Sequence, residues 1–281
     1  VSGDQPGNIM IDSGAFSAWS KGKTIDLNEY INYAKQAIEQ GNKQNKNVYI
    51  VNLDVIPGSK GQSTSLSKNR KDENRELVNG AAKQGYRNLV RMLKSGLKPI
   101  HVFHQGEDWY WLDKMAEKTD YIGISPANDL SIPARKKWMR TVFNYIYRRG
   151  LNVDTHGFAV WMPSILKEFP WASCDAITWR VVAGWGGIYY PQGDGFASPD
   201  YSKPPKIIHV SRRKNAEGIG VLTNGILKKL ERDGYTYEQL QDWEVRARIN
   251  VRYFLELEQY INECKRNSDF KPRQGLLDNQ L

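Results

Sequence analysis

The segment VYIVNLD, residues 48–54, shows the pattern on which the fold depends. It is a short apolar run that ends abruptly in polar residues. The same pattern recurs, with amphipathic helical segments between the runs. The other runs are NIMIDSG (8–14), PIHVFHQG (99–106), YIGISP (121–126), VDTHGFAV (153–160) and CDAITW (174–179), with KIIHVS (206–211) as a candidate seventh. This alternation predicts an α/β fold, and we expect a TIM-type (β/α)8-like barrel, irregular in places.

Capping residues mark helix starts at Asp26, Ser131 and Thr236, and the last of these predicts a long helix through Cys264. Residues 184–205 are rich in Gly, Pro, Tyr and Asp, which predicts a long loop. We therefore expect a barrel catalytic domain over residues 1–235. Residues 236–281 should form a C-terminal helix and tail packed on the barrel.

The composition favours an anionic partner. The 281 residues carry 40 Lys and Arg against 31 Asp and Glu, a net charge of +9, and a basic surface of this kind suits nucleic acid. Two cysteines are too few for a zinc quartet or a disulfide framework. No apolar run approaches the roughly 20 residues that span a bilayer. We expect a cytoplasmic protein with no membrane partner.

Three carboxylates stand at predicted strand ends: Asp12, Asp54 and Asp175. The loops after the strands of a (β/α) barrel open on one face, so these side chains should converge. Each also has a structural interpretation, because Asp12 suits an Asx turn, Asp54 suits a cap and Asp175 could pair with Arg180. The convergence of three favours a site.

Other strand ends carry groups that could read the edge of a base. Gln105 has a carboxamide that both donates and accepts, and Gly123 would let a ligand reach the backbone amide. His104 and His156 lack a third ligand at metal-site spacing, so we predict no catalytic metal and no cofactor. Ser13 and Ser125 lack a nucleophile motif. The sequence also lacks a phosphate-binding loop, a nucleophile elbow and a dinucleotide fingerprint.

Read in order, these strand ends resemble the motifs of the tRNA-guanine transglycosylase superfamily. DSGAFSAW (12–19) resembles its Asp-Ser-Gly-Gly-Phe-Gln segment, HQGE (104–107) its Val-Gln-Gly-Gly turn and IGIS (122–125) its Gly-Gly-Leu strand. HGFAV (156–160) is similar to Met-Gly-Val-Gly, and CDAITWR (174–180) to Phe-Asp-Cys-Val followed by Pro-Thr-Arg. The sequence Asp-Ser-Gly-Ala-Phe-Ser is most similar to the phage and bacterial branch that inserts 7-deazaguanines into DNA.

The resemblance implies an enzyme, a pentosyltransferase, that exchanges guanine in DNA for a 7-deazaguanine base such as 7-cyano-7-deazaguanine. Asp175 would be the nucleophile and Asp12 its carboxylate partner. The residues implied in substrate binding are Ser13, Gly14, Phe16, Asp54, Gln105, Gly123, His156 and Gly157. Arg180, Trp185 and Tyr189 would contact the nucleic acid, the last two by stacking. A phage-encoded protein of this kind would act in the host cytoplasm.

Three alternatives remain open from the sequence. The same exchange could act on tRNA, although the Cys and His zinc motif of the tRNA-acting members is missing and only Cys264 lies near the C-terminus. A nucleoside or nucleotide hydrolase would use water in place of the incoming base. A non-catalytic subunit would use the basic surface only to bind nucleic acid.

Overall fold

A computed structural model describes residues 8–57, 71–127, 130–212 and 220–266. They form two compact units. The first holds the described residues up to Phe158 together with Trp171–Ser173, and the second holds Ala159–Pro170 and the described residues from Cys174 onward. This division lies elsewhere than the boundary at residue 235 that the sequence suggested. Residues 267–281 of the expected C-terminal segment lie outside the described residues.

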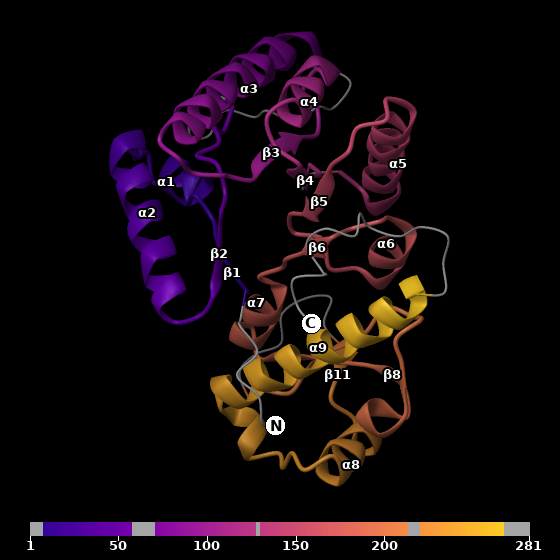
Figure 1. Cartoon of the computed structure of the whole chain (residues 1–281). Helices are drawn as coiled ribbons and strands as arrows, with labels where there is room; N and C mark the ends of the chain where they lie inside the picture. Colours follow the sequence, from indigo (N-terminus) through magenta and orange to yellow (C-terminus); the bar gives the residue numbers. More distant parts are fainter. Residues whose placement is uncertain (1–7, 58–70, 128–129, 213–219, 267–281) are drawn as a thin grey trace. The chain divides into compact units, whose positions relative to one another are not determined.

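The first unit is built from parallel strands in chain order (Figure 1). A parallel bridge between Val51 and Ile100 links its first pair of strands to the rest. The pair is β1 (Asn8–Ile11) with β2 (Asn47–Ile50). The remaining strands lie in the order β3 (His101–His104), β4 (Tyr121–Ser125), β5 (Asp154–Gly157) and β6 (Ser173–Cys174), and β3 to β5 are parallel. The carboxyl ends of these parallel strands therefore meet at one edge.

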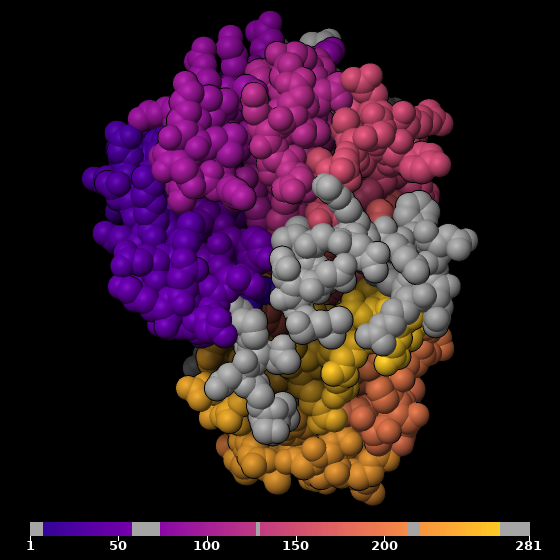
Figure 2. Space-filling view, in the orientation of Figure 1, coloured from indigo at the N-terminus to yellow at the C-terminus, as the bar shows by residue number. Residues whose placement is uncertain are grey.

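Helices alternate with these strands, which confirms the predicted mixed α/β class. Two predicted helix starts are also confirmed, because the Asp26 side chain accepts from the amides of Asn28 and Glu29, and Ser131 accepts from Ala134. In the space-filling view, side chains fill the space between α3 and α4 (Figure 2). The helices are α1 (Ala15–Ser20), α2 (Leu27–Lys43), α3 (Lys71–Lys94), α4 (Trp109–Ala116) and α5 (Ile132–Arg148).

The core beneath the first two strands comes from the apolar face of α2. Ile31 and Ala34 are buried there together with Ile50 of β2, and each large aliphatic side chain contributes about 1.5–3 kcal/mol on burial. The Tyr30 hydroxyl donates to the carbonyl of Val51 at 2.6 Å. This bond fixes α2 against the chain that leads from β2 to Asp54.

The second unit contains two corrections to the sequence interpretation. Residues 184–205 are not a loop, because they include β7 (Gly187–Tyr190), β8 (Gln192–Gly193), the 3-10 turn η1 (Gly195–Ala197) and β9 (Pro199–Asp200). The candidate seventh run forms β10 (Lys206–His209), but it pairs with β7 in antiparallel orientation, and β11 (Gly220–Val221) lies parallel to it. The pattern of apolar residues does not specify whether a strand runs parallel or antiparallel to its neighbour. That direction depends on where the connecting chain turns back.

The remaining helices of this unit are α6 (Pro163–Glu168), α7 (Thr178–Gly184), α8 (Asn224–Arg232) and α9 (Trp243–Arg266). Thr236 and Gln239 do bond reciprocally. They stabilise the short 3-10 turn η2 (Gln239–Gln241), and the extended backbone of Asp242 separates it from α9. The predicted long helix therefore begins at Trp243. None of the helices in the described ranges is long and apolar enough to cross a membrane.

Gly123 in β4 gives a test of the packing. A Cβ at this position would lie 2.4 Å from Cε2 of Phe158, and overpacking of this kind costs about 1–3 kcal/mol. We expect Gly123→Ala to lower the free energy of unfolding by that amount in urea denaturation. Gly80 in α3 is a matched control, because a Cβ there meets nothing within 4 Å, so Gly80→Ala should be neutral or stabilising. Equal effects at both positions would contradict the predicted contact.

Candidate functional site: a carboxylate-lined pocket in the first unit

A pocket of about 430 Å³ lies where strands β1 to β5 end. Its lining combines carboxylates, a histidine and a carboxamide with apolar side chains. The polar lining residues are Asp12, Ser13, Asp54, His104, Gln105, Glu107 and Ser125, and the apolar ones include Phe16, Val78, Val102 and Phe158. The structure thus brings together five of the predicted site residues: Asp12, Ser13, Phe16, Asp54 and Gln105. A concave site with a few convergent polar groups is typical of ligand binding.

Ser13 links the two aspartates of the pocket. Its amide donates to Asp12 Oδ1 at 2.8 Å, and its hydroxyl donates to Asp54 Oδ1 at 2.9 Å. The turn that allows this depends on Gly14, whose φ of +70° favours glycine. Gly14 is also the N-cap of α1, which carries Phe16 to the pocket rim with 65% of its surface exposed.

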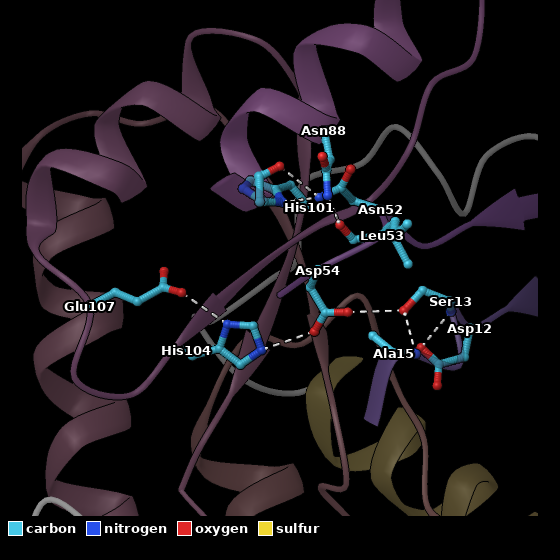
Figure 3. Close-up of polar contacts among 11 residues, drawn as sticks. Asp12, Ser13, Ala15, Asn52, Leu53, Asp54, Asn88, His101, His104 and Glu107 are labelled. Atoms are coloured by element: carbon cyan, nitrogen blue, oxygen red, sulfur yellow. Dashed lines mark hydrogen bonds and ion pairs between the residues drawn. The ribbon is translucent and has the colours of Figure 1, made fainter. Parts of the chain in front are cut away.

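His104 lies between two carboxylates (Figure 3). Its Nε2 is 3.2 Å from Asp54 Oδ2, and its Nδ1 is 3.0 Å from Glu107 Oε1. The Glu107 side chain is 5% exposed, the Asp54 side chain 15% and His104 25%. Figure 3 shows Asp12 and Ser13 on the far side of Asp54, so one polar chain runs from Asp12 to Glu107.

These contacts shift the pKa values of His104, Asp54 and Glu107. Burial alone would lower the pKa of His104, but its hydrogen bonds to Asp54 and Glu107 outweigh burial and raise the pKa to about 10. Burial would raise the pKa of Asp54, yet the bonds from His104 and Ser13 hold it below its usual range. Burial dominates at Glu107 and raises the pKa of that carboxyl. At neutral pH the pocket therefore presents an imidazolium paired with an ionised Asp54.

His101, three residues earlier on β3, shows the opposite behaviour. It is 2% exposed, and burial lowers its pKa to about 3. Its Nδ1 lies 2.8 Å from the Asn52 amide nitrogen, which is a donor, so the ring is neutral with its proton on Nε2. Two histidines on one strand thus differ in charge because only His104 meets carboxylates.

Gln105 has a fixed amide orientation. Its Oε1 accepts from the backbone amide of Ala127 at 3.0 Å. Since a backbone N–H can only donate, the carbonyl oxygen of Gln105 must face Ala127. The NH₂ group of Gln105 is the part left to donate to a ligand in the pocket.

Four predicted substrate-binding residues are not among those that line this pocket. Gly14 shapes the turn between Ser13 and α1. His156 is 2% exposed, and its Nδ1 lies 2.5 Å from the hydroxyl of Ser173. Gly157 is buried on β5 opposite Ile124. Gly123 is buried in the middle of β4, where the absence of a side chain makes room for the ring of Phe158. The contacts of these four residues with a base stay predictions, and Phe158, whose ring packs against Gly123, lines the pocket.

The remaining predicted residues belong to the second unit. Asp175 is exposed after β6, and its Oδ1 accepts from the amide of Ala159 at 3.0 Å. Arg180 is exposed on α7, and Trp185, which follows it, is 60% exposed. Tyr189 is 1% exposed, and its ring stacks on Tyr253. Its prediction as a base-stacking residue is therefore wrong, because β7 turns this side chain into the core.

Sequence reasoning missed Glu107 and Phe158 as pocket residues. The spacing of His104 and Glu107 around the turn at Gly106 was a usable signal for the first, because Gly106 has a φ of +108° and reverses the chain after β3. No comparable signal marked Phe158, since a Phe after a strand is most often part of the core.

Comparison of the chain with protein-family models finds no match, and comparison with curated proteins finds none either. The chemistry of the pocket residues is therefore the basis on which a function is proposed.

The raised pKa of His104 predicts a pH-dependent contribution to stability. A histidine whose folded pKa is raised stabilises the fold fully below its unfolded value near 6.5 and loses the effect as pH rises towards 10. We expect His104→Gln to cost about 3 kcal/mol near pH 6, because it leaves buried carboxylates without their cation. The cost should shrink by pH 9.5, as measured by urea unfolding of both proteins. A difference that stays constant over this range would show that His104 is not charged in the folded protein.

Proposed function

We propose that this protein is a nucleic-acid guanine transglycosylase that exchanges guanine in DNA for a 7-deazaguanine base. The observation that carries the proposal is the complementarity between the pocket and guanine. Asp54 offers two acceptor oxygens, and Gln105 offers an NH₂ donor. Guanine presents two adjacent donors, N1–H and the 2-amino group, beside the acceptor O6. The apolar rings of Phe16 and Phe158 suit the faces of a planar base.

The chain order of the strands supports a (β/α) barrel as the scaffold. A doubly wound sheet reverses its strand order near the middle, whereas β1 to β6 follow one another without reversal. In barrel enzymes the active site lies at the carboxyl ends of the strands, which is where Asp12, Asp54 and Gln105 line the pocket. Closure of the barrel is part of the proposal.

Two backbone conformations support the resemblance to the transglycosylase motifs. Gly14, with φ +70°, stands at the first glycine of the Asp-Ser-Gly-Gly-Phe-Gln segment. Ala159 stands at the last glycine of the Met-Gly-Val-Gly segment and has a φ of +54°. A left-handed conformation is uncommon for alanine and natural for glycine. Ala159 thus has a backbone conformation that is natural for glycine, which supports the match of HGFAV (156–160) to that segment.

The proposed mechanism has two displacements. The Asp175 carboxylate attacks C1′ of a deoxyguanosine, the bond to N9 breaks, and guanine leaves with a proton supplied by Asp12. N9 of the incoming 7-deazaguanine then displaces the aspartyl ester, and its proton passes to Asp12. Two inversions give net retention at C1′. The target nucleotide must be flipped out or single-stranded, because C1′ is inaccessible in a stacked duplex.

The basic charge and the exposed aromatic residues of the second unit support a nucleic-acid substrate. The net charge of +9 favours binding to phosphates. Arg180 and Trp185 are exposed on and just after α7, a few residues beyond Asp175, so they would contact the strand near the reacting nucleotide.

The nucleophile can be tested by following labelled guanine. Purified protein is incubated with DNA, or separately tRNA, that carries radiolabelled guanine, together with unlabelled 7-cyano-7-deazaguanine. We expect release of the label from DNA, and Asp175→Asn should lower the rate about 10³-fold or more. Asp200→Asn is a matched control, because Asp200 is a surface carboxylate of the same unit that pairs with Lys203.

The outcomes separate the alternatives. Release only from tRNA would move the substrate to RNA, and release without an acceptor base would indicate a hydrolase. Release from neither polymer, with binding retained, would leave a binding subunit and contradict the proposed exchange. Full activity of Asp175→Asn would remove Asp175 from the mechanism.

Asp54→Asn tests the base-recognition site. The substitution replaces an acceptor with a carboxamide of the same shape, so one guanine donor loses its partner. Because hydrogen bonds to charged groups contribute about 1.5–3 kcal/mol, guanine affinity measured by calorimetry should fall about 10- to 100-fold. Asp113→Asn, on α4 and away from the pocket lining, is the matched control. An unchanged dissociation constant for guanine in Asp54→Asn would exclude Asp54 from recognition.

A further inference from the structure

His104 is placed so that both of its ring nitrogens face carboxylate oxygens, 3.2 Å from Asp54 and 3.0 Å from Glu107. A neutral imidazole has one N–H and one lone pair, so in that form one nitrogen would turn its lone pair towards a carboxylate. Only the imidazolium donates to both when the carboxylates are ionised. The geometry therefore requires a cation at this position or a proton on a neighbouring carboxyl.

Glu107 holds the far side of the imidazole. Its side chain is 5% exposed, and Oε2 is buried without a hydrogen-bond partner among the described residues. A carboxylate so poorly solvated is tolerated because a cation lies against its other oxygen. Glu107 is thus an anchor for His104, and the turn at Gly106 brings the two together.

Asp54 is the pocket residue whose charge the His104–Glu107 pair stabilises. One of its oxygens accepts from Ser13 and the other from His104. Each carboxylate oxygen has two lone-pair directions, so each can accept one further hydrogen bond. Both bonds favour the ionised form, so the carboxylate of Asp54, which lines the pocket, offers acceptors and no donor.

We propose that His104, anchored by Glu107, is a positioning and specificity-determining residue that fixes Asp54 as a double acceptor and thereby selects bases with two adjacent N–H donors. This inference rests on the proposed function and attributes the base selectivity of the pocket to His104 and Glu107 acting through Asp54. Guanine and 7-deazaguanines have such an edge. Adenine places an unprotonated nitrogen at N1 and is rejected, because two acceptors would face each other.

Removing the cation should change the chemistry of Asp54. Burial without a compensating charge raises the pKa of a carboxyl, so in His104→Gln the carboxyl of Asp54 would take a proton at mildly acidic pH. A protonated Asp54 offers guanine a donor where an acceptor is required. The same donor would suit N1 of adenine, so discrimination between the two bases should narrow.

Two other titratable groups near Asp54, Tyr30 and His101, keep one protonation state between pH 5 and 8, so they would not produce this pH dependence of base binding. Burial raises the pKa of Tyr30 well above its usual value, so that hydroxyl stays protonated. His101 stays neutral, because burial lowers its pKa to about 3. Asp12 is the remaining carboxylate of the pocket lining, so Asp12→Asn in both backgrounds assigns the difference between the two profiles to the Asp54–His104–Glu107 cluster.

The test measures dissociation constants of guanine and adenine by calorimetry from pH 5 to pH 8. Wild type, His104→Gln and Glu107→Gln are compared at a temperature where thermal unfolding shows each to be folded. Glu117→Gln is the control, because Glu117 is a carboxylate of the same unit that pairs with Lys114 at the surface. Glu107→Gln keeps the shape of the anchor and removes its charge, so the inference stays testable if His104→Gln fails to fold.

For wild type and Glu117→Gln we expect guanine affinity to vary less than about threefold over this range. For His104→Gln we expect guanine binding about 10- to 100-fold weaker at pH 5.5 and recovering towards pH 8, since a tenfold change corresponds to one pKa unit. Glu107→Gln should shift the profile in the same direction by a smaller factor. A merely structural role for His104 would weaken binding equally at every pH.

The test distinguishes failure of the positioning role of His104 from failure of the proposed function. If wild type binds guanine but the His104 and Glu107 variants keep its flat profile and its preference over adenine, the positioning role is overturned and the proposed function stands. If wild type binds neither guanine nor 7-cyano-7-deazaguanine, the proposed function itself fails, and the selectivity role falls with it.

Discussion

The pocket depends on one ion pair, the contact of His104 with Asp54. A buried carboxylate is tolerated only when a cation or several donors offset the loss of its hydration, and three strand ends must meet to supply them here. Ser13 follows β1, Asp54 follows β2 and His104 ends β3. The parallel order of these strands is therefore a requirement of the electrostatics as well as of the core.

The same constraint explains how much of the site could be predicted from sequence. A polar residue that directly follows an apolar run lies at a strand end, and parallel strands place their ends together, so Asp12, Asp54 and Gln105 could be selected without coordinates. The start of α2 was equally accessible, because Asp26 bonds only to amides two and three residues away. Local features of this kind need no knowledge of tertiary packing.

Features that depend on tertiary packing could not be predicted. Tyr189 is buried because Asn250 of α9 accepts from its amide and Tyr253 stacks on its ring, and both partners lie about sixty residues away. His156 and His104 both stand near strand ends, but His156 is bonded to the hydroxyl of Ser173, whereas His104 lies between two carboxylates. Whether a histidine is neutral or charged depends on such neighbours, which sequence spacing does not specify.

The two aspartates linked by Ser13 occupy different environments. Asp54 is bonded to the imidazolium and to a hydroxyl, so its charge is fixed. Asp12 accepts from the Ser13 amide, a neutral donor, and is exposed at the pocket mouth. Catalytic sites divide roles between carboxyls whose environments differ, with the fixed charge used for binding and the other for proton transfer. One serine thus links the carboxylate that we propose for base recognition to the one that we propose for proton transfer. In that proposal the His104–Glu107 pair keeps Asp54 ionised while Asp12 exchanges the proton.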